Sequence, residues 1–141
     1  MSEDVKKNVV YKLELCDNEY CYEGHDEKFM IGMFSTFDKA KKTAEYYLNH
    51  VQGFCEYDCR YDITEKEVIG TGSIDSVSWV SGWNENEWFD EIEIVESDCY
   101  LDIEEAQQQM TKLQQQFIRT EWCVSRYAVD TCHWTEGFVR V

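Results

Sequence analysis

Basic residues are scarce in this chain. Thirteen Lys or Arg stand against 29 Asp or Glu in 141 residues, which gives a formal net charge of −16. A surface this acidic repels nucleic acid and anionic membranes, and it attracts basic groups. The charge therefore argues against direct binding of nucleic acid and predicts a basic protein partner.

Long apolar runs are absent as well. No stretch of 18 apolar residues occurs, and the start MSEDVKKNVV has no apolar segment of the kind that directs export. We therefore expect a cytoplasmic protein that does not enter a membrane. The hydrophobic fraction of 43%, with 15% aromatic residues, is enough to form a packed core. The length suits a single compact domain over residues 1–141.

The familiar motifs of catalysis are also missing. The sequence contains no G-x-S-x-G nucleophile turn, no G-x-x-x-x-G-K phosphate loop and no H-E-x-x-H metal motif. Paired carboxylates such as Glu91 and Glu93 could act as acid and base, but that spacing occurs in most acidic strands. We expect a protein that is not an enzyme and that needs no cofactor.

Seven cysteines without an export signal favour reduced thiols over a disulfide framework. Cys16, Cys21 and His25 invite a zinc interpretation, as does the CEYDC segment at 55–59, but neither has the C-x2-C spacing of a compact zinc knuckle. The CH dipeptide at 132–133 forms no catalytic pair, because adjacent residues in a strand face opposite sides. We therefore predict ordinary thiols and no metal site.

The first half of the chain alternates between strand-like and helix-like patterns. Apolar residues that alternate with polar ones, or that form short runs, predict three strands. Apolar residues at helical spacing predict one amphipathic helix, and Ser35 with Asp38 resembles a capping box at its start. The predicted order is strand 9–15, strand 28–34, helix 35–51 and strand 57–63.

A shift of 66 residues brings the same order of elements into register in the second half. Ala40 corresponds to Ala106, and Asp102 marks the start of a second helix. Few residues are identical across the shift, so chance similarity stays an alternative. We predict an α+β fold of two pseudo-repeated strand-strand-helix-strand units, about 8–72 and 74–141. Their strands would form a mainly antiparallel sheet with helices on one face.

Several short motifs resemble a family of short, uncharacterised bacterial α+β proteins. The motifs are VYKL at 10–13, KFMIGMFSTFDKAKKTA at 28–44, GF at 53–54 and YDI at 61–63. Members of that family commonly end in a segment like HWTEGF, which here lies at 133–138, whereas the first half closes with VIGTGS. This placement fits either duplication or insertion of a second unit into a single-unit ancestor. The resemblance implies a fold, and it transfers no activity and no catalytic residue.

The last nine residues, HWTEGFVRV, bring a histidine, a tryptophan and a glutamate close together. Alternation predicts a strand that enters a turn at Gly137, with the tryptophan in the core and the glutamate facing water. The alternative is a partner-binding surface that includes His133, Trp134 and Glu136. Trp134 and Glu136 are therefore candidate partner-binding residues.

The strongest signal for function lies between residues 67 and 111, which include twelve Asp or Glu and no Lys or Arg. Alternation in DEIEIVE predicts a strand that buries two isoleucines and shows carboxylates roughly 7 Å apart on its other face. The preceding connection, SWVSGWNENEWF, carries three tryptophans among acids, as is typical of protein interfaces. The candidate partner-binding residues here are Trp83, Glu85, Glu87, Trp88, Glu91 and Glu93.

Together these features favour a non-enzymatic protein-binding or inhibitor protein that uses an acidic, tryptophan-containing surface against a basic partner. An immunity-type inhibitor and a nucleic-acid mimic both depend on such charge complementarity. Two alternatives stay open, a small-molecule-binding module lined by aromatic residues and a small enzyme of unknown reaction. Acidic composition that serves only solubility is a further alternative.

Overall fold

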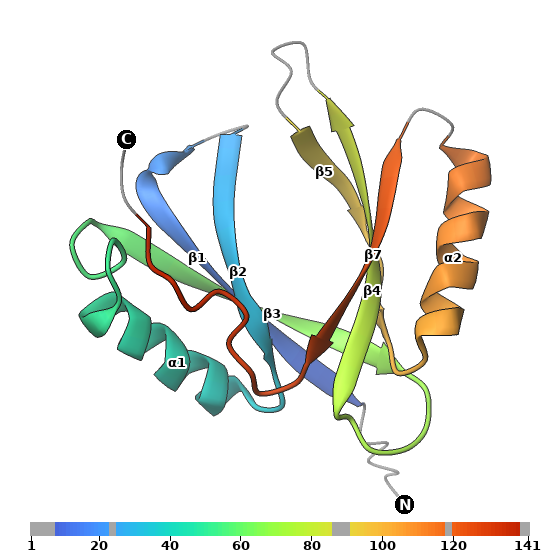
Figure 1. Ribbon diagram of the computed structural model, residues 1–141, viewed down its shortest axis with the longest axis horizontal. Coiled ribbons are helices and arrows are strands. Elements are labelled where there is room, and N and C mark those ends of the chain that lie inside the picture. The colour runs from blue at the N-terminus through green and yellow to red at the C-terminus, as the bar shows by residue number, and fades with distance from the viewer. Residues whose placement is uncertain (1–7, 23–24, 86–90, 118–119, 139–141) are drawn as a thin grey trace, which may run out of the picture. The chain divides into compact units, whose positions relative to one another are not determined.

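The computed structural model describes residues 8–22, 25–85, 91–117 and 120–138, with side chains except at 20–27 and 85–94. These residues form an α+β fold with two helices and mainly antiparallel strands (Figure 1), which confirms the predicted class at this level. Neither described helix has the length and apolar character needed to span a bilayer. The elements are β1 (Val9–Tyr22), β2 (His25–Phe34), α1 (Phe37–His50), β3 (Cys59–Ile69), β4 (Ser76–Glu85), β5 (Glu91–Glu96), β6 (Cys99–Tyr100), α2 (Ile103–Gln116) and β7 (Glu121–Ala128).

The chain divides into two compact units, and each contains stretches that are distant in sequence. The α1 unit consists of residues 9–66 together with 129–138, which we call the closing segment. The α2 unit consists of Asn8 and residues 67–128. These boundaries differ from the predicted repeats, so the internal duplication stays a prediction.

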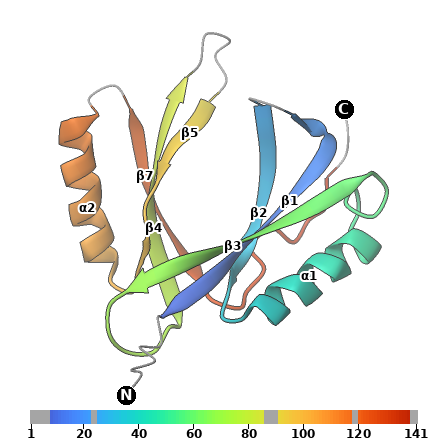
Figure 2. The same ribbon diagram turned by 180° about the vertical axis from the view of Figure 1, so that it is seen from behind.

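In the α1 unit, β1 lies between β2 and β3 (Figure 2). β1 and β2 pair in antiparallel register, from Tyr11 opposite Phe34 onward. Along β1 from Tyr11 to Asn18, the hydrogen-bond partners run back from Glu65 to Asp58, so β3 is also antiparallel. Strand β1 continues beyond the predicted strand 9–15, to Tyr22, and β2 begins before the predicted strand 28–34, at His25. Bulges interrupt their pairing there, and such irregularity hides a strand from a search for strict alternation.

Helix α1 covers one face of these strands. Its buried residues are Ala40, Ala44 and Tyr47, which pack with the core side chains of β1 and β2. This confirms the predicted amphipathic helix. The N-cap, however, is Thr36, whose hydroxyl oxygen accepts from the Lys39 backbone N–H at 3.1 Å. The predicted cap at Ser35 is wrong by one residue, because the Ser35 hydroxyl donates to Asp130 instead.

In the α2 unit, β4 is the central strand. It pairs antiparallel with β5, β6 and β7, while the end of β3 pairs parallel with β6. Asp102 is the N-cap of α2 and accepts from the Glu104 backbone N–H at 2.9 Å, so the predicted helix start is confirmed. The two-residue strand β6 was not predicted, since it is too short to show alternation.

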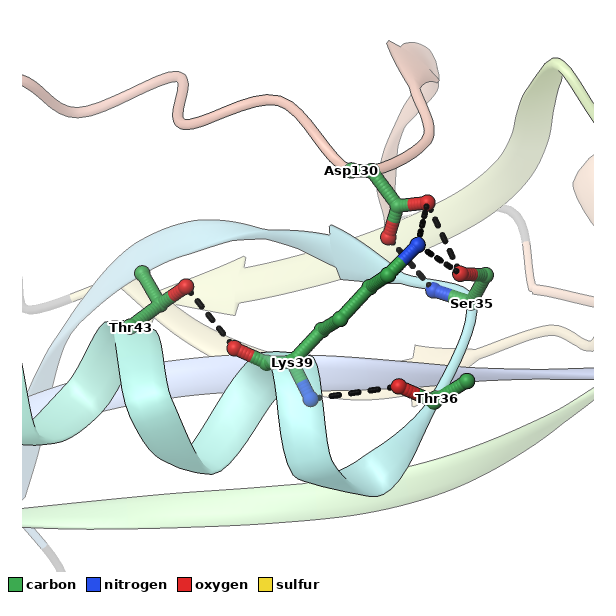
Figure 3. Close-up of polar contacts among 5 residues, drawn as sticks. All are labelled: Ser35, Thr36, Lys39, Thr43 and Asp130. Atoms are coloured by element: carbon green, nitrogen blue, oxygen red, sulfur yellow. Dashed lines mark hydrogen bonds and ion pairs between the residues drawn. The ribbon is translucent and has the colours of Figure 1, made fainter.

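The closing segment contains no regular strand, so the strand predicted near the C-terminus is wrong. Its second residue is Asp130, the one described non-glycine residue with a positive φ, +62°. Figure 3 shows the Asp130 carboxylate at the start of α1, where it accepts from the Ser35 N–H at 2.8 Å and the Ser35 hydroxyl at 2.7 Å. The Lys39 ammonium lies 3.2 Å from the same carboxylate. These contacts hold the beginning of the closing segment to α1.

The Asp130 contacts predict a pH-dependent contribution to stability. Burial by itself raises the pKa of Asp130, but the hydrogen bonds from Ser35 and the Lys39 ammonium outweigh burial and lower it. The carboxylate therefore stabilises the fold above its unfolded-state pKa, about 4, and this contribution is lost as pH falls through the lower folded-state pKa. We expect Asp130→Asn to lower the free energy of unfolding by about 1–2 kcal/mol at pH 7 in urea titrations.

The difference between Asp130→Asn and the parent should shrink as the pH falls below about 4. Asp38→Asn is the matched control, because Asp38 and its partner Lys42 are 70% and 75% exposed and such pairs contribute about 0.5 kcal/mol or less. A difference that stays constant from pH 7 to the acid limit would contradict the assigned role of the carboxylate.

Candidate partner-binding site

The predicted site residues are divided between the two units. Glu87 and Trp88 lie outside the described residues, and the structure describes only the backbone of Glu85, Glu91 and Glu93. That backbone places these three glutamates, together with the half-buried Trp83, in the hairpin of β4 and β5. Trp134 and Glu136 belong to the closing segment of the α1 unit.

Trp83 is at the centre of a row that crosses three strands. In the β4–β5 register it pairs with Glu93, and in the β4–β7 register it pairs with Glu121. Directly paired residues of adjacent antiparallel strands share one face of the sheet. The register therefore places a tryptophan between two glutamates, and one of them, Glu121, is exposed.

A bulge in β5 adds a further carboxylate to this face. Ser81 pairs with Glu96, yet Trp83, two residues later, pairs with Glu93, so β5 contains one extra residue. In regular pairing, residues three apart would occupy opposite faces. Because of the bulge, Glu93 and Glu96 share a face. We call the register positions of Trp83, Glu93, Glu96 and Glu121 the acidic face; Ser81 shares this side of the sheet but is only 3% exposed.

The acidic face is not the face that α2 covers. At the end of α2, the ring of Phe117 lies 6.0 Å from that of Trp122, centroid to centroid. Trp122 pairs with Gly82 and its ring fills the space above that glycine, where an added Cβ would lie 2.6 Å from a ring carbon. Since Gly82 and Trp83 are adjacent in β4, they occupy opposite faces. Helix α2 therefore does not cover the acidic face.

The basic residues of the α2 unit that the structure describes lie on α2 or on the face that it covers. Residues 67–128 contain thirteen Asp or Glu and three Lys or Arg, a net charge of −10. Lys112 lies on α2, and Arg126 donates to the Ser78 hydroxyl at 3.1 Å, with which it shares the face that α2 covers. Arg119 lies outside the described residues. Neither Lys112 nor Arg126 therefore occupies a position of the acidic face.

Trp134 has a structural role. Its ring packs edge-on against Phe29 at 5.0 Å, and its carbonyl oxygen accepts from the Tyr47 hydroxyl at 2.6 Å. Burial, and then a hydrogen bond with Cys132, raise the pKa of Tyr47, so the phenol keeps the proton that it donates. The ring of Trp134 is still 41% exposed, and Glu136 is exposed. Trp134 and Glu136 lie in the closing segment, which contains no regular strand, so they form no cross-strand row like that of Trp83.

The cysteine predictions hold in part. Cys55, Cys59, Cys99, Cys123 and Cys132 form no disulfide bond. Cys16 is disulfide-bonded, which corrects the expectation of reduced thiols at that position, and its partner is not among the described side chains. The expectation relied on the missing export signal, which carries no information about local geometry. Among the side chains that the structure describes, no group of three His, Cys, Asp or Glu could hold a metal ion.

Glu96 and Glu121 were not recognised from the sequence. The first shares the acidic face only through the bulge, and the second only through pairing of β4 with β7, about 40 residues further along the chain. Comparison with protein-family models, curated protein sequences and solved structures gives no match.

The acidic face predicts an unequal response of Trp83 to charged quenchers. Negative potential around the ring should favour caesium over iodide, because ions of opposite sign accumulate there. The contribution of Trp83 to the fluorescence is the difference between the parent and Trp83→Phe. We expect caesium to quench this contribution more strongly than iodide does at low salt. Glu121→Gln should reduce the ratio of the two quenching constants. Equal quenching of this contribution by both ions would show that the ring is not in a negative environment.

Proposed function

We propose that this protein is a non-enzymatic binding or inhibitor protein that engages a basic protein partner through the acidic face of its α2 unit. The observation that carries the proposal is the row in which Trp83 stands between Glu93 and Glu121. A tryptophan with polar neighbours resembles the composition of binding hot spots, where an aromatic side chain is the apolar anchor and charges surround it.

The register of the hairpin supports this proposal. Glu85 pairs directly with Glu91, and like charges at directly opposed positions destabilise a β ladder. A hairpin selected only for stability would favour opposite charges there. A basic partner would offset the repulsion on binding, and the field of the acidic unit would raise its rate of association. The opposed carboxylates of Glu85 and Glu91 would therefore both weaken the free hairpin and attract a basic partner.

Two kinds of partner agree with this chemistry. An immunity-type protein would block a basic toxin, and a nucleic-acid mimic would occupy the Arg- and Lys-rich groove of a nucleic-acid-handling enzyme. In both cases carboxylates would occupy sites on the partner that bind phosphate groups or acidic side chains. A cytoplasmic setting for either stays a prediction, and the disulfide bond of Cys16 does not support it.

An internal duplication is part of the proposal. The two helices have 14 residues each, and both their ends differ by 66 positions. In each half, the first strand pairs antiparallel with the second strand and with the strand that follows the helix. The N-caps Thr36 and Asp102 obey the same shift. These correspondences support two related strand-strand-helix-strand units, each with its helix on one face of its own strands.

The test is affinity capture from nuclease-treated lysate of the source organism, with washes at low and high salt and identification by mass. We expect one basic protein, retained at low salt and released at high salt. Its dissociation constant at low salt should rise roughly tenfold in Glu121→Lys, and its salt dependence should flatten. The identity of the protein would decide between toxin neutralisation and nucleic-acid mimicry.

Glu45→Lys is the matched control, because it makes the same change in net charge on an exposed position of α1. Affinity should fall less in this variant than in Glu121→Lys, because Glu45 does not belong to the acidic face. Equal losses in the two variants would show that net charge, and not the acidic face, attracts the partner. Capture that Glu121→Lys leaves unchanged would remove the acidic face from the proposal.

A further inference from the structure

Two Gly-Phe pairs, 84 residues apart in the chain, meet in the α1 unit. The Phe138 N–H donates to the Gln52 carbonyl oxygen at 3.0 Å. A Cβ on Gly137 would overlap that same carbonyl, and a Cβ on Gly53 would overlap the carbonyl oxygen of Phe138. Gly53 also has a φ of +85°, which favours glycine. The two backbones therefore approach as closely as they do only because both positions are glycine.

An aromatic cluster surrounds the phenylalanine of the closing segment. The Phe138 ring stacks on Phe29 at 4.9 Å and meets Phe54 edge-on at 4.9 Å. Tyr57 lies on another side, at 5.8 Å. Phe54 is 1% exposed and belongs to the hydrophobic core of the unit. Phe138 thus completes a core that residues 9–66 leave open.

The other end of the closing segment lies along the outer edge of β2. Asp130 donates its backbone N–H to Met33 at 2.8 Å, and His133 donates to Ile31 at 2.8 Å. The partners run in opposite directions, as in an antiparallel pair. β2 is the terminal strand of the sheet order, so its edge is available for such pairing. The closing segment binds this edge as an added, irregular strand.

The last residues of β3 connect the first half of the chain to the α2 unit. Val68 and Ile69 continue the strand of the α1 unit, yet they pair with Cys99 and Tyr100 of β6. The Leu101 N–H also donates to the Ile69 carbonyl at 3.0 Å. Val68 is 7% exposed. The chain therefore enters the core of the α2 unit at the point where it leaves the α1 unit.

We infer that each half of the chain supplies the segment that completes the other half, and that the closing segment occupies a peptide-docking site on the α1 unit. The docked peptide is extended, carries an aspartate that binds the start of α1, and contains Gly-Phe at 137–138. Its covalent neighbour β7 belongs to the α2 unit, and the turn at Asp130 separates the two. The site recognises the segment by edge pairing, by its carboxylate and by an aromatic pocket.

Hydrogen exchange on the full chain tests the exchange of segments. Phe138→Ala should raise the exchange rate of α1 amides such as Ala44 roughly tenfold or more, and leave α2 amides such as Ala106 unchanged. Val68→Ala should raise the exchange rate of α2 amides and leave α1 amides unchanged, although Val68 belongs to β3. Glu136→Ala is the control within the closing segment, because this exposed side chain should affect neither helix. Loss of protection in the helix of the same half, or equally in both helices, would overturn the inference.

Addition of the segment in trans tests the docking site. Gly137→Ala should displace the closing segment by overlap with Gln52 and reduce protection of α1. A peptide of residues 129–141 added to this full-length variant should restore protection at saturating concentration, whereas the same peptide with Gly137→Ala should not. Asp130→Asn, which weakens the segment without overlap, gives a second background for the same titration. Failure of the parent peptide to restore protection in both variants would overturn the docking site.

Discussion

The close approach of two backbone segments at Gln52–Gly53 and Gly137–Phe138 is the constraint on which the α1 unit depends. Without it Phe138 could not reach the aromatic cluster of Phe29 and Phe54, because a single added Cβ on either glycine would separate the segments. The fold thus uses glycine to allow contact between parts of the chain that are remote in sequence. Edge pairing with β2 and the Asp130 carboxylate then fix the direction in which the closing segment runs.

Aromatic and acidic residues have different surroundings in the two units. In the α1 unit, the aromatic and acidic residues near the C-terminus are engaged with the core and with α1, so Trp134 and Asp130 stabilise the unit. In the α2 unit, Trp83 has acidic neighbours in both adjacent strands, and the described basic residues lie on the other side. The same residue types therefore have different roles, according to whether the surrounding contacts satisfy them.

Local patterns were sufficient for the helices and for parts of most strands. The amphipathic spacing of α1 and the cap at Asp102 follow from side chains within one or two helical turns. Predictions from local patterns were wrong or incomplete where a residue distant in the sequence changes the local contacts. Ser35 did not become the N-cap because Asp130 binds its hydroxyl, and Glu96 joined the acidic face because a bulge shifted its register. Trp83 and Glu93 of the acidic face could be recognised from the sequence, and Glu121 could not, since it arrives from β7.

The sequence by itself determined the net charge, the concentration of acids between residues 67 and 111, and the periodicity of the helices. These are properties of composition and of neighbours within a few residues. Only the tertiary structure decided which carboxylates share a face with Trp83 and that the last residues complete the first half of the chain. Strand register, bulges and backbone approach arise from pairing between residues far apart, and one residue of slip moves every side chain to the opposite face.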